Sequence, residues 1–309
     1  MGIVSLHHVT ATVDEAQADL DFSLGVLGLR LVKKTVNFDN HHVFHFYYGD
    51  RTGTPGTIWT TFPYRGHNVR AGTRGAGQVT ATVFSVPTGS LSAWRAHLAS
   101  RGIAATDLAP RFGVPAIGFS DPSGLDFEIV AGADARKPWS ARVDADIAIR
   151  GLHSVAIAVR DPAPTVEFMS SLLGWRRVDE AEGRIRMTIG GGGPAHLIDV
   201  VHRAVAPLAV NGIGTVHHVA MAIETEAEQL ALRERLVAFG SKVTEVRDRC
   251  YFKSIYFREP GGVLFEVATQ APGFTLDEPE PALGRALKLP PWEEANRADI
   301  EAHLPPVTH

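Results

Sequence analysis

The sequence VHHVA at residues 216–220 closely repeats LHHVT at residues 6–10, and this repetition decides the fold. Each copy sets two histidines among branched and small residues, a composition typical of β-strands. About 50 residues after the second copy, the run GGVLFEV at residues 261–267 reads as another strand, with Glu266 in its middle. Internal similarity at such spacings predicts a chain built from repeated structural units.

The first unit shows which elements are repeated. Residues 4–13 alternate as in a strand, and the segment from Asp14 to Gly28 has the apolar spacing of a helix. Three further strands are expected at residues 31–38, 43–48 and 57–62. The same order begins again at Val79, Gly151 and Val216, with helices expected at residues 91–101, 164–173 and 226–239. The chain is therefore predicted to be an α+β protein of four βαβββ modules that form two barrel-like domains.

The modules suggest a division of the chain into domains. A segment rich in charge and alanine at residues 134–150 is interpreted as a linker between two pairs of modules, residues 1–133 and 151–270. The tail, residues 271–309, is rich in proline and acidic at first. It is expected to carry a short helix at residues 292–304, which is too short to be stable unless it packs on the body.

The composition limits the classes of function. The chain of 309 residues is 45% hydrophobic and 21% charged, and its net charge of −4 gives no basic surface for nucleic acid. Its single cysteine, Cys250, cannot form an internal disulfide, which suits a reducing compartment. No apolar run reaches the length of a membrane span, and the first residues lack the pattern of a signal peptide. We expect a cytoplasmic globular protein, with neither nucleic acid nor a membrane as partner.

Two histidines and one acid on different strands are predicted to bind a metal. Side chains two residues apart share a face of a strand, so His8 lies on the same face as Thr10 and His7 points away. His218 and Glu266 occupy strands of the fourth unit. If the sheets of the first and fourth units surround a common space, His8, His218 and Glu266 converge there. Such a ligand set leaves positions open on a divalent metal, where dioxygen and a substrate oxygen can bind together.

The remaining histidines are interpreted differently. His7 and His217 precede the two predicted ligands, and strand alternation turns them away from the metal, where they can orient a ligand. His41, His42 and His45 lie close together on one strand without a nearby acid, and they are interpreted as surface and core histidines.

The second and third units offer a rival location for a metal. Glu128 lies as many residues after Thr80 as Glu266 lies after His218. Thr80 is therefore taken as the counterpart of the ligand histidine. These two units supply two acids but only one histidine, so their cavity is interpreted as a decayed or structural copy. The residues of this second cavity are Glu128, His153 and Asp199.

Several motifs together resemble one protein family. They are SLHHVT at residues 5–10, GTPGT at 53–57, TFP at 61–63, RFG at 111–113, HH at 217–218 and RCYFKSIY at 249–256. With the repeated βαβββ unit, they resemble the vicinal oxygen chelate superfamily of glyoxalases, resistance proteins, epimerases and extradiol dioxygenases. They are most similar to the hydroquinone ring-cleaving dioxygenases related to 2,6-dichlorohydroquinone 1,2-dioxygenase. The resemblance covers nearly the whole chain, including residues 287–292.

This resemblance implies a function and a set of site residues. It implies Fe(II), with Mn(II) as the alternative, bound by His8, His218 and Glu266, and a hydroquinone opened by O2, including substituted or halogenated rings. It leaves open whether the protein is a homo-oligomer. Arg249 would neutralise a phenolate, and Tyr256 would donate a hydrogen bond to the substrate or to bound oxygen. The catalytic residues that the resemblance implies are Thr10, Arg249 and Tyr256, with His7 and His217 close by.

Two other classes of protein remain as alternatives. A glyoxalase-like isomerase or an epimerase can use a related metal site, although a glyoxalase usually adds a fourth protein ligand, and residues 57–61 (TIWTT) contain no acid. A metal-free binding protein of the bleomycin-resistance type would not need His8, His218 and Glu266 together. The ligands alone do not decide the reaction, and the resemblance over the whole chain favours ring cleavage.

Overall fold

The computed structural model describes residues 2–309 and contains four modules of one kind. Each has a strand, a helix and three more strands, which confirms the predicted α+β fold of βαβββ modules. The first comprises β1 (Ile3–Val13), α1 (Ala16–Leu20), the π-helical η1 (Asp21–Val26), β2 (Arg30–Asn37), β3 (Asn40–Gly49) and β4 (Ile58–Pro63). The second comprises β5 (Gln78–Val86), α2 (Leu91–Ala99), β6 (Thr106–Arg111), β7 (Val114–Ser120) and β8 (Asp126–Ala131).

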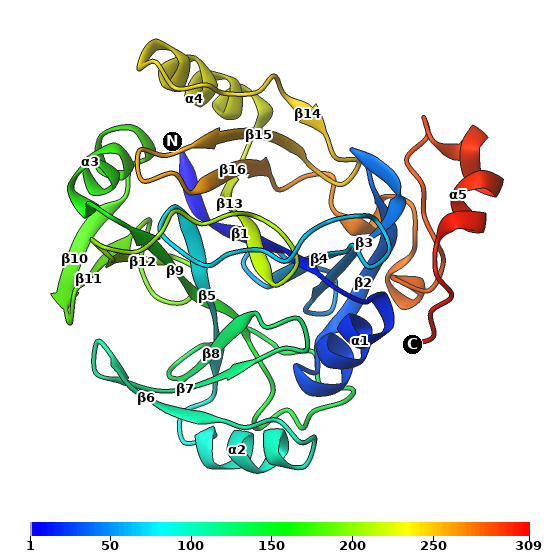
Figure 1. The fold of residues 1–309 in the computed structure, drawn as a ribbon, viewed down its shortest axis with the longest axis horizontal. Coiled ribbons are helices and arrows are strands. Elements are labelled where there is room, and N and C mark those ends of the chain that lie inside the picture. The colour runs from blue at the N-terminus through cyan, green and yellow to red at the C-terminus, as the bar shows by residue number, and fades with distance from the viewer. Residues whose placement is uncertain (1) are drawn as a thin grey trace.

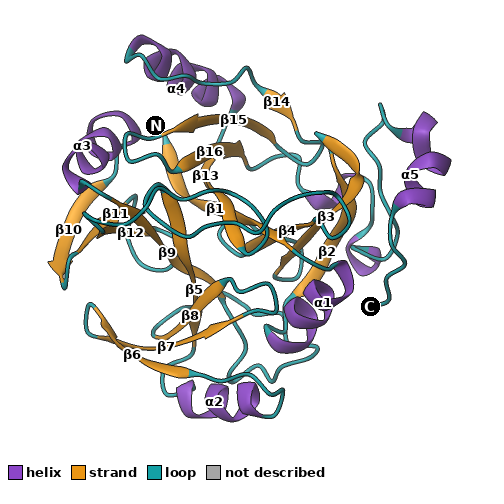
Figure 2. Ribbon diagram, in the orientation of Figure 1, coloured by secondary structure: helices purple, strands orange, loops and turns teal. Residues whose placement is uncertain are grey.

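The third and fourth modules repeat this order. The third comprises β9 (Gly151–Val159), α3 (Pro162–Leu173), β10 (Arg176–Ala181), β11 (Arg184–Thr188) and β12 (Leu197–His202). The fourth comprises β13 (Thr215–Ile223), α4 (Glu226–Ala238), the short β14 (Arg247–Asp248), β15 (Lys253–Arg258) and β16 (Leu264–Thr269). Figure 2 shows the strands in the interior of the view, with α2, α3, α4 and α5 around the outside.

The sixteen strands form two sheets of eight, and each sheet combines two modules. The first and fourth modules share the order β14-β15-β16-β13-β1-β4-β3-β2, and the second and third share β10-β11-β12-β9-β5-β8-β7-β6. In each sheet the first strands of the two modules, β1 with β13 and β5 with β9, pair antiparallel at the centre. The sheets therefore do not follow the division into residues 1–133 and 151–270, because each sheet takes strands from both segments (Figure 1). Independent folding of those two segments stays a prediction.

Local sequence signals set the helix ends, as α3 illustrates. The side chain of Asp161 accepts a hydrogen bond from the backbone N–H of Ala163, and Pro162 occupies the first turn, where its missing N–H costs nothing. The helix ends at Gly174, whose φ of 79° is a left-handed conformation that glycine adopts without strain. The apolar side chains between these ends, Phe168, Met169 and Leu173 among them, are buried against the sheet.

The C-terminal tail packs on the first module. It contains the 3-10 turns η2 (Phe274–Leu276), η3 (Glu280–Ala282) and η4 (Glu294–Asn296), followed by α5 (Arg297–His303), within the range expected for a helix. Ile300 of α5 is fully buried in a small apolar cluster with Val36 of β2 and Leu289 of the tail. This packing supplies the stability that so short a helix lacks by itself.

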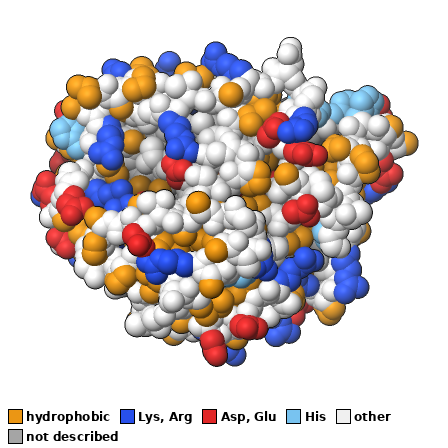
Figure 3. Space-filling view, turned by 60° about the horizontal axis from the view of Figure 1, so that its bottom comes forward, with side chains coloured by type: hydrophobic (Ala, Val, Ile, Leu, Met, Phe, Trp, Pro, Cys, Tyr) orange, Lys and Arg blue, Asp and Glu red, His pale blue; other side chains and the backbone are white. Residues whose placement is uncertain are grey.

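The surface carries charges of both signs. On the face shown in Figure 3, Lys and Arg side chains are interspersed with Asp and Glu. Among residues 2–309, no helix is both long and apolar enough to cross a membrane.

Candidate metal centre

The three predicted metal ligands converge at the centre of the first sheet. The Nε2 atoms of His8 and His218 lie 3.2 Å apart, and Oε2 of Glu266 lies 3.3 Å from the first and 2.8 Å from the second. All three side chains are buried. The structure thus brings together the ligand set expected from sequence, and these residues form one of two clusters among the described residues that could hold a metal ion.

Strand register explains this convergence. Ala220 of β13 is paired with His8 of β1 on one side and with Glu266 of β16 on the other. Residues paired across neighbouring strands project from the same face of a sheet. His218 lies two residues before Ala220 and therefore shares that face. A ligand from each of three adjacent strands is consequently aimed at one point.

Two strand irregularities bring His7 and His217 beside the ligands, where alternation alone would not place them. The pairing of β1 with β13 shifts by one residue between Leu6 and His8, and again on β13 opposite Thr10 and Ala11. Each shift inserts an extra residue, as in a β-bulge, which re-aims the side chains. Nδ1 of His7 consequently lies 2.8 Å from Nδ1 of His8, and the same atoms of His217 and His218 lie 2.7 Å apart. Strand alternation alone does not predict these two contacts, and the role of His7 and His217 in orienting the ligands stays a prediction.

The orientation of His8 and His218, the inner two of the four histidines, suits the binding of a cation. Burial lowers the pKa of both His7 and His217 to about 3, so these outer rings are neutral and can accept a hydrogen bond at Nδ1. If His8 and His218 donate their Nδ1–H groups to them, the Nε2 atoms of both inner rings present lone pairs to each other and to Glu266.

Glu266 completes this arrangement. Its Oε1 accepts a hydrogen bond from the hydroxyl of Ser254, whereas its buried Oε2 has no hydrogen-bond partner among the described residues. Burial alone would raise the pKa of this carboxyl group, but His8 and His218, when they carry a proton, hold it well below its usual range, so the group is a carboxylate. Three electron-pair donors that face one another without a shared proton repel, and a divalent cation between them removes that repulsion. The residues present therefore fit a metal ion.

A cavity of about 180 Å³ opens over the candidate ligands. This volume is below the roughly 300–1,000 Å³ of most small-molecule pockets, so the cavity admits only a compact ligand. Phe252 forms one wall, with its ring 5.3 Å from that of His8. The lining residues are His8, Asn37, Phe38, Asp39, His45, Tyr47, Phe62, Tyr64, His217, His218, Arg249, Phe252, Tyr256 and Glu266.

Arg249 and Tyr256 act together on one side of this cavity. Nε of Arg249 donates to Oη of Tyr256 at 3.0 Å, and Nη2 donates to Asp39 at 3.0 Å. Burial opposes the charge of the guanidinium, but Tyr256 and Asp39 outweigh it and raise the pKa of Arg249. Burial and the charge of Glu266 raise the pKa of Tyr256, so the phenol keeps its proton. Since Tyr256 accepts from Arg249, its own hydrogen is free to be donated to a ligand.

Thr10 lies beneath the cavity floor in a buried chain of hydrogen bonds. Its Oγ1 accepts a bond of 2.9 Å from Thr60, whose hydroxyl lies 2.9 Å from Nε2 of His45. Thr10 is not among the lining residues, so its position beside His8 supports the ligand strand more directly than it supports a substrate. His45, in the middle of β3, does line the cavity and was missed as a site residue, because it was grouped with His41 and His42 at the start of that strand. Its place facing Thr60 across β3 and β4 is a tertiary pairing that local sequence does not reveal.

Each of the two acids predicted for the second site pairs with an arginine. Arg111 donates two hydrogen bonds to Glu128, and Arg186 donates two to Asp199. His153 is bonded to the hydroxyl of Ser154 at 3.0 Å, and the three residues do not form a metal-binding cluster within the described chain. A separate cluster of His41, His42 and Asp299 lies at the partly exposed surface.

Comparison with known proteins agrees with this site. Residues 151–267 match the family described as the glyoxalase/bleomycin resistance protein/dioxygenase superfamily. The chain is 36% identical to the chlorohydroquinone/hydroquinone 1,2-dioxygenase of Sphingobium indicum over 96% of this chain and 95% of that one. It is 38% identical to MhqO of Bacillus subtilis, provisionally assigned as a ring-cleaving dioxygenase, over 98% of this chain and 96% of that one.

Solved structures agree as well. A crystal structure of a provisionally assigned dioxygenase from Bacillus subtilis superimposes with a TM-score of 0.94 at 38% identity, covering 99% of this chain and 98% of that one. A mutant of maize glyoxalase I shares the fold alone, with a TM-score of 0.66 at 15% identity over 89% of this chain and 96% of that one. The chain therefore belongs to the glyoxalase/bleomycin resistance/dioxygenase superfamily and, within it, to the ring-cleaving dioxygenases.

Proposed function

We propose that the protein is an Fe(II)-dependent dioxygenase that opens the ring of a hydroquinone with O2. The observation that carries the proposal is the convergence of His8, His218 and Glu266 beneath a cavity that also holds a guanidinium and a protonated phenol. A relative named as acting on hydroquinone and chlorohydroquinone supports the substrate class. Fe(II) bound by these ligands would acidify a hydroxyl group of the substrate and supply the electrons that activate O2.

The side chains around the cavity have separate tasks in this reaction. The charge of Arg249 favours the phenolate form of the bound hydroquinone, and Tyr256 donates a hydrogen bond to an oxygen that gains negative charge. Phe62 and Phe252 provide apolar walls for the ring and restrict the entry of water. Neutral His7 and His217 hold the ligand rings in one orientation through their Nδ1 atoms.

The first module supports a three-ligand site over a glyoxalase-like site with four protein ligands. Thr10 is paired with Thr60 of β4 in the same way that Ala220 is paired with Glu266 of β16. The first module thus has a hydroxyl group where the fourth has a carboxylate. Positions left open on the metal suit the simultaneous binding of O2 and a substrate oxygen.

Oxygen uptake tests the proposal directly. Protein loaded anaerobically with Fe(II) is given hydroquinone, methylhydroquinone, chlorohydroquinone or catechol, and O2 consumption is compared with the loss of aromatic absorbance. One O2 consumed per ring opened with a hydroquinone is the expected result. A protein that holds one metal ion per chain but consumes no O2 with any of the four would contradict ring cleavage and favour the isomerase alternative.

Replacing Tyr256 with Phe is expected to lower kcat/KM for the hydroquinone by about 10–100-fold, the effect of losing one hydrogen bond to a charged oxygen. The bound metal content should stay the same, because Tyr256 is not a ligand. Tyr48→Phe is the matched control, since its hydroxyl bonds to Asp19 in the core away from the cavity. Equal losses of activity in the two variants would argue that Tyr256 acts only through the stability of the fold.

A further inference from the structure

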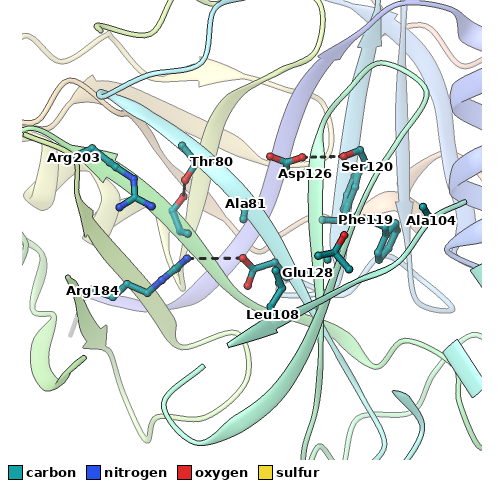
Figure 4. A pocket seen from close by; sticks show the side chains of 14 residues that line it. Thr80, Ala81, Ala104, Leu108, Phe119, Ser120, Asp126, Glu128, Arg184 and Arg203 are labelled. Carbon is teal, nitrogen blue, oxygen red and sulfur yellow. Dashed lines mark hydrogen bonds and ion pairs between the residues drawn. The ribbon is translucent and has the colours of Figure 1, made fainter. Parts of the chain in front are cut away.

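The second sheet encloses a larger cavity than the metal centre does. It has a volume of about 430 Å³, within the range of roughly 300–1,000 Å³ typical of small-molecule sites. The cavity lies on β5 and β8 of the second module and reaches β11 of the third (Figure 4). Its sheet has the same arrangement of modules as the sheet of the metal centre, so the residues of the two sheets can be compared position by position.

Strand register gives this comparison. Glu128 of β8 is paired with Val83 of β5, and Asp199 of β12 is paired with Ala156 of β9. These two acids correspond to Glu266, which is paired with Ala220 of β13. His218 lies two residues before Ala220. The positions that correspond to the ligand histidines therefore lie two residues before Val83 on β5 and before Ala156 on β9.

Small residues occupy those two positions, which are Ala81 and Ser154. Thr80 and His153 fall at shifts in the strand pairing, where the metal centre has His217 and His7. The spacing argument that equated Thr80 with His218 was therefore one residue off. The second sheet therefore has an acid at both positions, of which Glu128 lines the cavity, but no histidine at either ligand position.

Arginines supply positive charge beside both acids of the second sheet. Nε and Nη2 of Arg111 lie 2.7 Å from the two oxygens of Glu128, and Arg186 holds Asp199 at 2.8 and 2.9 Å. Both pairs have the two-pronged geometry that guanidinium groups form with carboxylates. The charges of both acids are thereby neutralised without a metal ion.

Two further arginines, Arg184 and Arg203, line the cavity, and Figure 4 shows them on one side of the view, with Arg184 directed at Glu128. The nearest carboxylate oxygen that pairs with Arg184 is Oε1 of Glu128, at 4.0 Å, beyond hydrogen-bonding distance. Arg203 forms no ion pair within the described chain, and its Nη1 donates only to the adjacent carbonyl of His202 at 3.3 Å. Burial and the nearby charge of Arg111 lower the pKa of Arg184, as expected where positive charges are crowded.

The rest of the cavity is mixed in character. Asp126 also lines it, but its carboxylate is already bonded to Ser120 and to Arg74. Leu108 and Phe119 supply apolar surface, and Thr106 offers a further hydroxyl group. Guanidinium groups match the planar oxygens of a carboxylate or phosphate, while apolar side chains match a hydrocarbon body.

We propose that this second cavity binds a small amphipathic oxyanion. Its carboxylate or phosphate head lies between Arg184 and Arg203, and its apolar body lies against Leu108 and Phe119. The proposal does not depend on the reaction at the metal centre, because none of these side chains lines the cavity over His8, His218 and Glu266.

Isothermal titration calorimetry of the full-length, Fe(II)-loaded protein under anaerobic conditions tests the site. The probes are benzoate, phenyl phosphate, inorganic phosphate and neutral benzyl alcohol. An aromatic anion is expected to bind more tightly than both inorganic phosphate and benzyl alcohol. The stronger of benzoate and phenyl phosphate identifies the preferred head group. Equal affinity for benzyl alcohol and the anions would overturn the proposed role of the arginines.

Variants assign the binding to this cavity. Arg184→Gln and Arg203→Gln are each expected to weaken binding of the aromatic anion at least about tenfold, the effect of losing a hydrogen bond to a charged group. Arg142→Gln, a control at an exposed position, should leave affinity unchanged. Glu266→Gln should also retain binding, which excludes the metal centre as the site.

Because Arg203 is exposed, its replacement keeps the test valid if Arg184→Gln fails to fold. Unchanged affinity in folded Arg203→Gln, or loss of binding in Glu266→Gln, would overturn the proposal.

Discussion

Replacing Glu266 with Gln is expected to abolish stoichiometric metal binding and to lower ring-cleaving activity by at least about 10³-fold, since metal catalysis is worth several kcal/mol. The glutamine keeps the shape of the side chain and an acceptor for Ser254, so the core is preserved. It removes the one negative charge that faces the two Nε2 atoms. The measurements are metal content by mass spectrometry after loading and oxygen uptake with a hydroquinone.

Glu128→Gln provides a matched control from within the same chain. Glu128 occupies the equivalent place in the second sheet and is buried to a similar degree, but it is held by Arg111 and not directed at histidines. Its replacement should leave both metal content and oxygen uptake unchanged. If Glu266→Gln kept one tightly bound metal ion per chain, or if Glu128→Gln lost it, the metal would have to be assigned to another site.

The repetition of the βαβββ module made the fold predictable from sequence, except for some of the strands at the sheet edges. The central strands β1 and β13 have branched and small residues in alternation and were located closely, although both of their faces are buried. Two strands at the edges of the second sheet, β6 and β10, lack this signal. All residues of β10 (Arg176–Ala181) are exposed, and the polar β6 (Thr106–Arg111) buries none of its side chains fully. Such strands form because a neighbouring strand pairs with them, and local sequence contains no record of that pairing.

The sequence also does not show which two modules combine in one sheet. All four modules open with similar strands, so their sequences alone do not show which of them share a sheet. The convergence of His8 with His218 required the first and fourth modules to pair, and the structure pairs them. The division into consecutive pairs of modules relied on the linker composition, which reflects chain connectivity and not sheet order.

Alternation also failed at the residues next to the ligands. A strand is expected to turn neighbouring side chains to opposite faces, but a bulge adds a residue and breaks this rule. His7 and His217 therefore reach their ligand neighbours through Nδ1. The bulge depends on how β1 pairs with β13, so no analysis of either strand alone could have located it. The same dependence on pairing hid His45, which meets Thr60 across two strands.

Replacing Lys33 with Met is expected to lower the free energy of unfolding by about 3–5 kcal/mol, the usual cost of leaving a buried charge without its partner. Lys33 on β2 is completely buried, and its Nζ lies 2.5 Å from both Asp277 and Glu278 of the tail. Glu278 is itself buried, so the methionine would leave its carboxylate unpaired in the core. Urea denaturation followed by circular dichroism measures the change, with Lys137→Met at an exposed position as the control.

A double variant separates charge from packing at this position. If the loss comes from the unpaired carboxylate, Lys33→Met combined with Glu278→Gln should recover much of it, because no buried charge then remains. The same contacts extend to the active-site loop, since Tyr251 donates to Asp277 at 3.1 Å and lies two residues after Arg249. Lys33→Met should therefore also reduce kcat while the metal content stays the same. Full stability in the single variant would show that the tail is held by its apolar contacts, and the ion pairs would then serve only to position Arg249.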